Sequence, residues 1–277
     1  MDSRTAFMFH CATVMIISSF LREPYEFLIL QLTTGMVVIQ TLRELSQRSQ
    51  IIRTALVITL TYIVIHTSFV LIQNDEIRFD RSYYIYMIVN GVLLLFTYPL
   101  LYVFEKVFGF ISDVTLVELS NISNPLLQRM SEIAPGTFQH SMQVANLSAE
   151  VAKKIGARSQ LVRTGALYHD IGKLERPVFF TENQKGISPH SHLTPERSAE
   201  VIIEHVTNGL SLADNNNLPA QIKRFIMTHH GNGKTKYFYI MWKNLHHGEE
   251  PDESLFSYPG PNPSSKEEAI LMMADAV

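Results

Sequence analysis

Tyr168-His169-Asp170-Ile171-Gly172-Lys173 is the stretch that decides how the rest of this chain is interpreted. An imidazole and a carboxylate that are adjacent in sequence can bind the same divalent metal ion, and a carboxylate can also bridge two ions. Mixed nitrogen and oxygen ligands suit iron, manganese or zinc better than magnesium or calcium, which prefer oxygen ligands. The chain contains 11 histidines, and further metal-binding residue types surround the stretch: His140, His205, His229, His230 and Asp275. This pattern predicts a metallohydrolase.

These residues are numerous enough to bind two metal ions, if one carboxylate is shared. Two ions about 3.5–4 Å apart can bind and polarise a phosphodiester. Lys173 follows Asp170 by three residues and can place a cation near a phosphate oxygen. His190 and His192 lie in a predicted loop near the site, where substrate contact and a surface position are equally open interpretations. The remaining histidines are interpreted as ordinary packed or solvated residues: His10, His66, His246 and His247.

Composition limits the partners and the compartment. The 277 residues carry a formal net charge of −3 and have a pI near 6.4, which argues against nucleic acid as a partner. Cys11 is the single cysteine, so the sequence contains neither a disulfide framework nor a cysteine-rich zinc module. This composition fits a reducing compartment for the less apolar part of the chain.

The first hundred residues are much more apolar than the rest and predict a lipid bilayer as a partner. Four apolar segments of about 17 to 22 residues each have the length that crosses about 30 Å of hydrocarbon. They are residues 5–21, 25–42, 51–72 and 84–104. The first segment could be mistaken for a signal peptide, but no small-residue cleavage pattern follows it. The sequence therefore predicts about four membrane spans in residues 1–104.

The short loops between these segments predict the orientation. Arg43, Arg48 and Arg53 follow the second segment with a single acid, Glu44, whereas the loop after the third segment has mixed charge. The positive-inside rule places the arginine-rich loop in the cytoplasm, and everything after Glu105 is then cytoplasmic as well.

Residues 105–130 are predicted to be linker helices, and residues 131–277 an all-helical domain. Helical periodicity and end signals indicate helices at about 138–155, 161–170, 195–206 and 219–230. Another begins at Ser265, which with Glu268 fits a capping box. Long loops are expected at 175–194 and 231–264, and loops of that size inside a compact domain are usually functional or disordered. The predicted fold class is therefore all-α, with a transmembrane helix bundle followed by a cytoplasmic helical domain.

The metal-binding pattern resembles the HD-domain phosphohydrolases, which have a His…His-Asp…Asp metal set. The likeness is closest to the bacterial seven-transmembrane HD-domain proteins, over roughly residues 105–277. Besides the His-Asp-Ile-Gly-Lys stretch, it is carried by Ala134-Pro135-Gly136-Thr137-Phe138-Gln139-His140-Ser141, Glu182-Asn183-Gln184, His229-His230-Gly231 and Tyr258-Pro259-Gly260-Pro261.

The resemblance implies a phosphodiesterase of the bacterial cell membrane that hydrolyses cyclic di-AMP to pApA with two iron or manganese ions. It implies one metal ion bound by His140, His169, Asp170 and Asp275, and a second bound by Asp170, His205, His229 and His230. Asp170 is then the catalytic bridge, with Lys173 as a second catalytic residue. Lys173 and His190 are the expected substrate contacts. A homo-oligomer is among the expected states.

Two departures from the family pattern lead to a further expectation. The family has an extracytoplasmic N-terminal domain and seven spans, and its HD domain continues past the last metal-binding aspartate. This chain has about four predicted spans and two residues after Asp275, so we expect a sequence truncated at both ends. The residues themselves leave two other functions open: an HD hydrolase of a guanosine alarmone or a deoxynucleotide triphosphate, and a non-catalytic nucleotide-binding membrane receptor.

Overall fold

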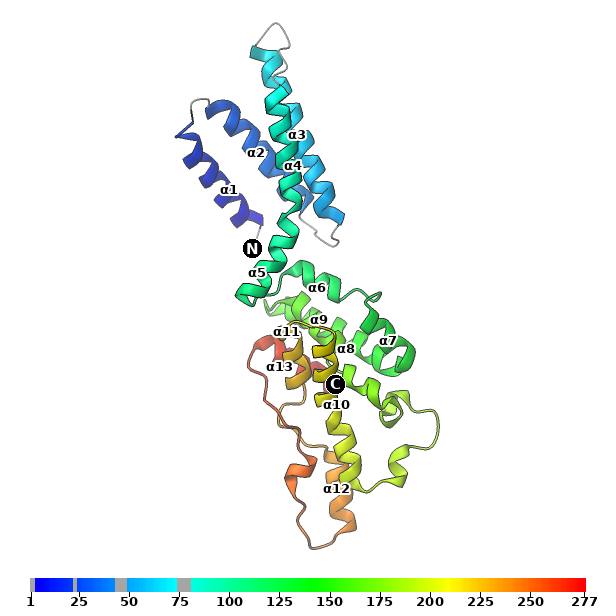
Figure 1. Ribbon diagram of the computed structural model, residues 1–277. Helices are drawn as coiled ribbons and strands as arrows, with labels where there is room; N and C mark the ends of the chain where they lie inside the picture. The colour runs from blue at the N-terminus through cyan, green and yellow to red at the C-terminus, as the bar shows by residue number, and fades with distance from the viewer. Residues whose placement is uncertain (1–2, 22–23, 43–48, 74–80) are drawn as a thin grey trace. The chain divides into compact units, whose positions relative to one another are not determined.

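A computed structural model describes residues 3–21, 24–42, 49–73 and 81–277, which belong to two compact units (Figure 1). The first unit ends at Val114 and the second begins at Thr115. Within the described residues the secondary structure is helical, and the one β-type pairing is an isolated antiparallel bridge between Lys234 and Ser257. The predicted all-α class is confirmed. The predicted linker at 105–130 is divided between the two units.

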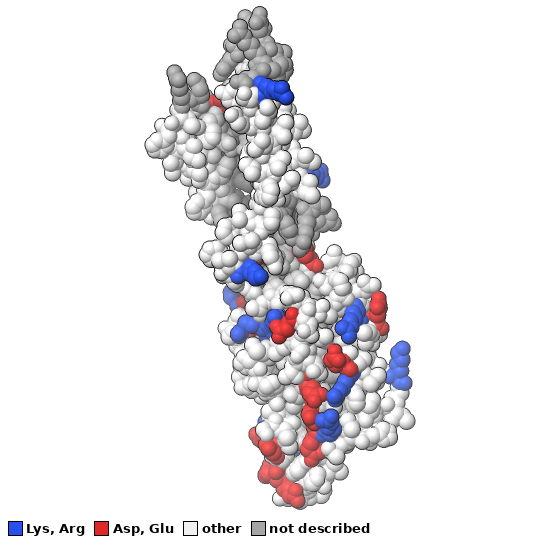
Figure 2. All heavy atoms as spheres, viewed as in Figure 1, with Lys and Arg blue, Asp and Glu red and all other residues white. Residues whose placement is uncertain are grey.

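The described residues of the first unit form five helices whose outward-facing side chains are largely apolar. On α3, for example, Leu56, Leu60 and Val64 are more than half exposed, which suits contact with lipid better than contact with water. Few charged side chains appear on its described surface in the view of Figure 2. The helices are α1 (Ser3–Ser18), α2 (Pro24–Thr41), α3 (Ser49–Gln73), α4 (Arg81–Leu95) and α5 (Thr97–Phe108).

The prediction of about four spans is not confirmed by these helices. Among the described residues, one helical stretch, Ile52–Ile72, is long and apolar enough to cross a membrane. A bent pair, Arg81–Leu95 with Pro99–Phe108, qualifies as a second if the two are counted together. The predicted fourth span is interrupted at Phe96, just before Pro99, which has no N–H to continue the helix. At 16 and 18 residues, α1 and α2 are about 24 and 27 Å long, shorter than the hydrocarbon layer.

Most of the loop charges on which the predicted orientation depends lie outside the described residues. They are Arg43, Glu44, Arg48, Asp75, Glu76, Arg78 and Asp80. The structure places Arg53 and Arg81 within α3 and α4.

His66 is packed inside the first unit, as its isolated position in the sequence predicted. Its Nδ1 lies 2.6 Å from Glu26 Oε1, and its ring contacts those of Tyr83 and Tyr84. This hydrogen bond and the ring contacts tie α2, α3 and α4 together and give the polar groups partners that apolar packing alone would not supply.

The second unit contains seven helices, most of an eighth (α6, which begins two residues before it) and several short 3-10 turns. The helices are α6 (Asp113–Leu119), α7 (Pro125–Ile133), α8 (Pro135–Lys154), α9 (Ser159–Tyr168), α10 (Pro195–Asn215), α11 (Ala220–Thr228), α12 (Lys236–Leu245) and α13 (Lys266–Asp275). The turns are η1 (Ile171–Glu175), η2 (Pro177–Phe179), η3 (Thr181–Asn183), η4 (Pro189–His192) and η5 (Glu253–Phe256). The five predicted helices are present, and Ser265 caps α13 as expected. The prediction of a long loop over 231–264 is wrong in part, because residues Lys236–Leu245 form helix α12.

Helix α9 is the centre of this unit, packed against α8, α11 and α13 (Figure 1). Its residues from Thr164 to Tyr168 are fully buried, and small side chains allow its neighbours to approach closely. A Cβ atom at Gly165 would lie 2.3 Å from the Phe225 ring of α11. The Tyr168 hydroxyl donates to the Leu119 carbonyl, 2.7 Å away, which fixes the end of α9 and hence His169.

Gly172 brings η1 into direct contact with the middle of α10. A Cβ atom there would lie 1.8 Å from the His205 carbonyl oxygen and 2.5 Å from the Gly209 nitrogen, closer than any real contact. Because Asp170 immediately precedes η1, this backbone contact also sets the separation between Asp170 and His205.

We expect Gly172→Ala to lower the free energy of unfolding by about 1–3 kcal/mol, because overpacking forces the backbone apart. It should also weaken metal binding by moving Asp170 away from His205. Thermal unfolding and metal titration measure both effects. Gly186→Ala is the control for metal affinity alone, since a Cβ atom there meets nothing within 4 Å, whereas its φ of 136° disfavours alanine and lowers stability by itself. Equal metal affinity in the two variants would contradict the explanation.

Candidate metal centre

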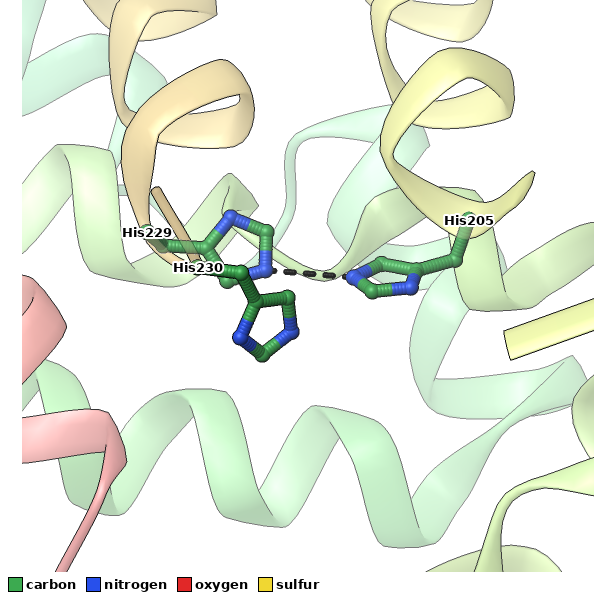
Figure 3. A group of neighbouring side chains, drawn as sticks. All are labelled: His205, His229 and His230. Atoms are coloured by element: carbon green, nitrogen blue, oxygen red, sulfur yellow. Dashed lines mark hydrogen bonds between the residues drawn. The ribbon is translucent and has the colours of Figure 1, made fainter. Parts of the chain in front are cut away.

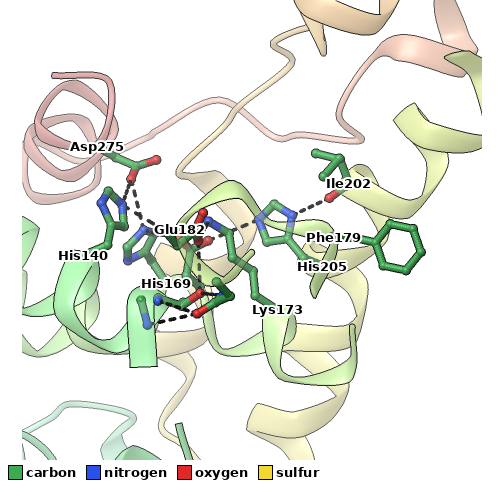
Figure 4. Close-up of polar contacts among 12 residues, drawn as sticks. His140, His169, Lys173, Phe179, Glu182, Ile202, His205 and Asp275 are labelled. Atoms are coloured by element: carbon green, nitrogen blue, oxygen red, sulfur yellow. Dashed lines mark hydrogen bonds and ion pairs between the residues drawn. The ribbon is translucent and has the colours of Figure 1, made fainter. Parts of the chain in front are cut away.

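The seven predicted metal ligands are brought together in two adjoining groups in the second unit. The first group is His140, His169, Asp170 and Asp275, and the second is His205, His229 and His230 (Figures 3 and 4). Within each group the ligand atoms lie within 4.8 Å of one another. His140 comes from α8 and His205 from α10, whereas the other five residues lie at the ends of α9, α11 and α13.

The Asp170 carboxylate lies between the two groups and is only 2% exposed. Its Oδ2 atom faces the first group, 3.2 Å from His169 Nε2 and 4.0 Å from His140 Nε2. Its Oδ1 atom faces the second group, 3.4 Å from His205 Nε2 and 3.7 Å from His229 Nε2. A carboxylate in this position can offer one oxygen to a cation in each group.

The three most deeply buried histidines are oriented by the backbone of their own helices. His169, His205 and His229 each donate from Nδ1 to the carbonyl oxygen three residues earlier, over 2.6, 2.5 and 2.8 Å. These bonds fix the ring orientation and leave Nε2 as the atom that faces the site. Such second partners are the usual way in which proteins orient metal-binding histidines.

The unsatisfied atoms of the site fit a metal cation. His205 Nε2 lies 3.1 Å from His229 Nε2 (Figure 3), yet both rings already use Nδ1 as the donor, so in the neutral rings two lone pairs face each other. Asp170 Oδ1 is buried without a hydrogen-bond partner. Buried polar atoms are costly unless they are paired, and a cation with nitrogen and oxygen ligands would satisfy all three atoms.

The local field also favours a cation. Helices α9, α11 and α13 all end at the site, and the C-terminal end of a helix carries partial negative charge. Burial lowers the pKa of His205 and His229, and it lowers the pKa of His230 to about 4, with His205 adding to that effect. The second group is therefore neutral at pH 7, which is the form of histidine that binds metal.

The first group is more strongly charged. Asp275 Oδ1 lies 2.8 Å from His140 Nε2 and 3.1 Å from His169 Nε2. Burial lowers the pKa of His169, but Asp170 and Asp275 outweigh it and raise the pKa to about 10. The pKa of Asp170 is well below its usual value, because the attraction of His169 and Lys173 exceeds the cost of burial. Metal binding at this group must therefore displace a proton from His169.

Lys173 places a fixed cation at the edge of the first group (Figure 4). Its Nζ lies 2.7 Å from Asp170 Oδ2 and 2.9 Å from Glu182 Oε1. Burial lowers the pKa of Lys173, but the two carboxylates raise it above its ordinary value overall, so the side chain is charged at neutral pH.

A cavity of about 670 Å³ adjoins the second group. Tyr258 stacks on the His230 ring at a centroid distance of 4.1 Å, and Phe180 meets the His205 ring edge-on at 5.8 Å. Six of its fifteen lining residues have aromatic rings: Phe179, Phe180, His190, Tyr237, Phe238 and Tyr258. Phe179, Phe180 and Phe238 were not among the predicted site residues, although they lie in the two long loops expected at 175–194 and 231–264, whose length was the available signal.

His190 lines this cavity and lies outside both ligand groups. Its Nε2 donates to the Phe179 carbonyl oxygen, 3.0 Å away, and its ring contacts Phe179 and Phe238. Its role as a substrate contact stays a prediction. His192 is exposed and is not part of the cavity lining.

Comparison with known families agrees with this geometry. The HD-domain family model matches residues 137–277, which include all seven ligands. The chain belongs to the HD-domain family. A second model, described as a 7TM receptor with intracellular HD hydrolase, matches residues 1–112. The two matches together indicate a membrane protein with an HD domain, and the resemblance seen in the sequence motifs is confirmed.

Two curated relatives match most of the chain. The cyclic-di-AMP phosphodiesterase PgpH of Listeria monocytogenes serotype 1/2a (strain 10403S) is 36% identical over 309 residues, covering 98% of this chain and 41% of the relative. The protein of the same name from Bacillus subtilis (strain 168) is 38% identical over 253 residues, covering 89% of this chain and 35% of the relative. The chain thus spans about two fifths of the length of these proteins.

The second unit also resembles a solved structure. The crystal structure of the L. monocytogenes PgpH HD domain in complex with cyclic-di-AMP is 45% identical in sequence and has a TM-score of 0.53. The match covers 56% of this chain and 72% of that chain.

Metal analysis tests the bridging position of Asp170. We expect the purified chain to bind two manganese ions, and Asp170→Ala to bind less than one, because its carboxylate is shared by both groups. Elemental mass spectrometry measures the ratio. Asp214→Ala, which removes an exposed carboxylate paired with Lys223 on the surface of the same unit, should still bind two. Two tightly bound ions in Asp170→Ala would rule out a bridging role.

Proposed function

We propose that this chain is part of a membrane-anchored, metal-dependent phosphodiesterase that hydrolyses cyclic di-AMP to pApA. The observation that carries the proposal is the Asp170 carboxylate, shared by two groups of ligands beside an aromatic cavity. Relatives that match nearly the whole chain are named as cyclic-di-AMP phosphodiesterases, and the matching solved structure is a complex with that nucleotide.

The seven ligands suit two iron or manganese ions. His140, His169 and Asp275 would hold one, and His205, His229 and His230 the other, with Asp170 common to both. Divalent ions at these positions supply Lewis-acid stabilisation of the negative charge that develops on the phosphoryl group. The chain's own contribution is to fix the ligands by backbone hydrogen bonds, so that little reorganisation is needed during the reaction.

Lys173 and the cavity would bind the parts of the substrate that the metal ions do not. The Lys173 ammonium has three donors, and its carboxylate partners use two of them, so one donor is left for a phosphoryl oxygen. A cavity of about 670 Å³ is in the size range of nucleotide-sized ligand sites. Aromatic rings such as Phe179 and Tyr258 can stack on a base, and His190 forms part of the same wall.

For the first unit we propose about four spans in the bacterial cell membrane, with the HD domain in the cytoplasm. The apolar surface of α3 and the family match over residues 1–112 support it. Alkaline phosphatase, which is active only outside the cytoplasm, should be active when fused after Asp80 and inactive when fused after Arg48. The opposite pattern would reverse the orientation, and equal activity at both points would remove the span between them.

Activity is tested with the manganese-loaded chain in detergent. We expect conversion of cyclic di-AMP to pApA, and a loss of more than about 100-fold in His169→Ala and Asp170→Ala, since even outer partners of metal ligands are worth 10–100-fold. His247→Ala, which changes an exposed histidine of the same unit, should keep full activity. Nucleotide analysis by liquid chromatography measures the product.

A substrate panel separates this proposal from the alternatives. Turnover of a guanosine alarmone or a deoxynucleotide triphosphate in preference to cyclic di-AMP would assign a different HD hydrolase. Tight binding of cyclic di-AMP by the metal-loaded chain without any turnover would assign a receptor.

A further inference from the structure

The turn η3 is attached to the first turn of α8 by Asn183. Asn183 Oδ1 accepts from the backbone N–H groups of Gly136 and Thr137, at 2.9 and 3.2 Å, and its Nδ2 donates to Thr137 Oγ1 at 2.7 Å. The N-cap residue of α8 is Ala134, which has no polar side chain to satisfy these groups. Asn183 therefore caps α8 from a position 47 residues further along the chain.

Gly136 permits this close approach. A Cβ atom at this position would lie 2.0 Å from the Glu182 carbonyl oxygen and 2.9 Å from Asn183 Oδ1. The Pro135-Gly136-Thr137 and Glu182-Asn183 motifs, which are far apart in the sequence, thus form a single junction.

The junction ends at the metal centre through Glu182. Glu182 Oε1 accepts from Thr137 Oγ1 at 3.0 Å and from Lys173 Nζ at 2.9 Å, and Lys173 also contacts Asp170 Oδ2 (Figure 4). Glu182 is in neither ligand group. Glu182 is therefore a carboxylate beside Lys173 that would keep its negative charge when metal ions occupy the two ligand groups.

This difference matters when the ligand groups carry metal. Two divalent ions bound at Asp170 would partly neutralise its carboxylate and repel the neighbouring ammonium, so Asp170 alone would no longer hold Lys173. A second carboxylate, fixed by its own contacts, offsets that repulsion and keeps the ammonium in place. The contact with the Phe180 ring, 5.0 Å from Lys173 Nζ, further limits where the side chain can go.

We propose that Glu182 is a positioning residue, which Thr137 and Asn183 fix to α8 and which holds the Lys173 ammonium beside Asp170 to bind a phosphoryl oxygen of the substrate. The inference rests on the proposed phosphodiesterase activity for its substrate. It extends that activity by assigning a role to two motifs that bind no metal.

The test compares Glu182→Gln, Lys173→Met and the double variant in the full chain, loaded with manganese. Glu182→Gln keeps the size of the side chain and its acceptor for Thr137 but removes the charge. We expect it to weaken binding of inorganic phosphate, measured calorimetrically, and to lower kcat/KM for cyclic di-AMP, each by about tenfold. The manganese content should stay at the wild-type value, because Glu182 is not a ligand.

The double variant separates positioning from a general structural role. If Glu182 acts only through Lys173, adding Glu182→Gln to Lys173→Met should change phosphate affinity by less than about twofold. Glu182→Asp keeps the charge on a shorter side chain, so it should lose less phosphate affinity than Glu182→Gln. If Glu182→Gln does not fold, Glu182→Asp takes its place in the comparison with Lys173→Met. Glu253→Gln, which breaks an exposed Lys234–Glu253 pair in the same unit, should have no effect.

Several results would overturn the inference. They are wild-type phosphate affinity in Glu182→Gln, additive losses in the double variant, loss of manganese from Glu182→Gln, or no phosphate binding by the wild-type chain. A wild-type chain that does not hydrolyse cyclic di-AMP, but binds phosphate tenfold better than Glu182→Gln, would instead refute the proposed substrate and support the positioning role.

Discussion

The buried carboxylate of Asp170 is the constraint on which the second unit depends. A carboxylate that is 2% exposed is costly unless charged partners surround it, and one of its oxygens has no hydrogen-bond donor. Histidines on two sides of the carboxylate and Lys173 on a third side offset this cost. The same feature that is costly for folding is thus the one that could hold metal ions.

The architecture follows from the need to bring polar ligands to one buried point. Three helices end there, so that backbone carbonyls can orient the imidazoles and the helix ends contribute negative charge. The backbone of Gly172 lies against that of α10, and the backbone of Gly165 lies against the Phe225 ring of α11, which brings the central elements close together. The segments between the ligand-bearing helices then form the cavity and the junction at Glu182, which lie outside both ligand groups.

Much of the metal centre could be predicted from sequence, because ligand chemistry restricts residue types so strongly. Adjacent His169 and Asp170 indicated one site, and the structure brings every predicted ligand to it. Features that depend on tertiary context were harder to predict. Helix α12 lacks clear end signals, the helix break near Pro99 shortened a predicted span, and the role of Glu182 arises from contacts with residues 9 and 45 positions away.

The central claim is that Asp170 is shared by two metal ions, and anomalous diffraction from crystals of the manganese-loaded protein tests it most directly. The account predicts two anomalous peaks about 3.5–4 Å apart, with one Asp170 oxygen bound to each ion. The histidines should approach the ions through Nε2, as their orientation in the structure requires. A single peak, or two peaks with Asp170 bound to only one of them, would contradict the account.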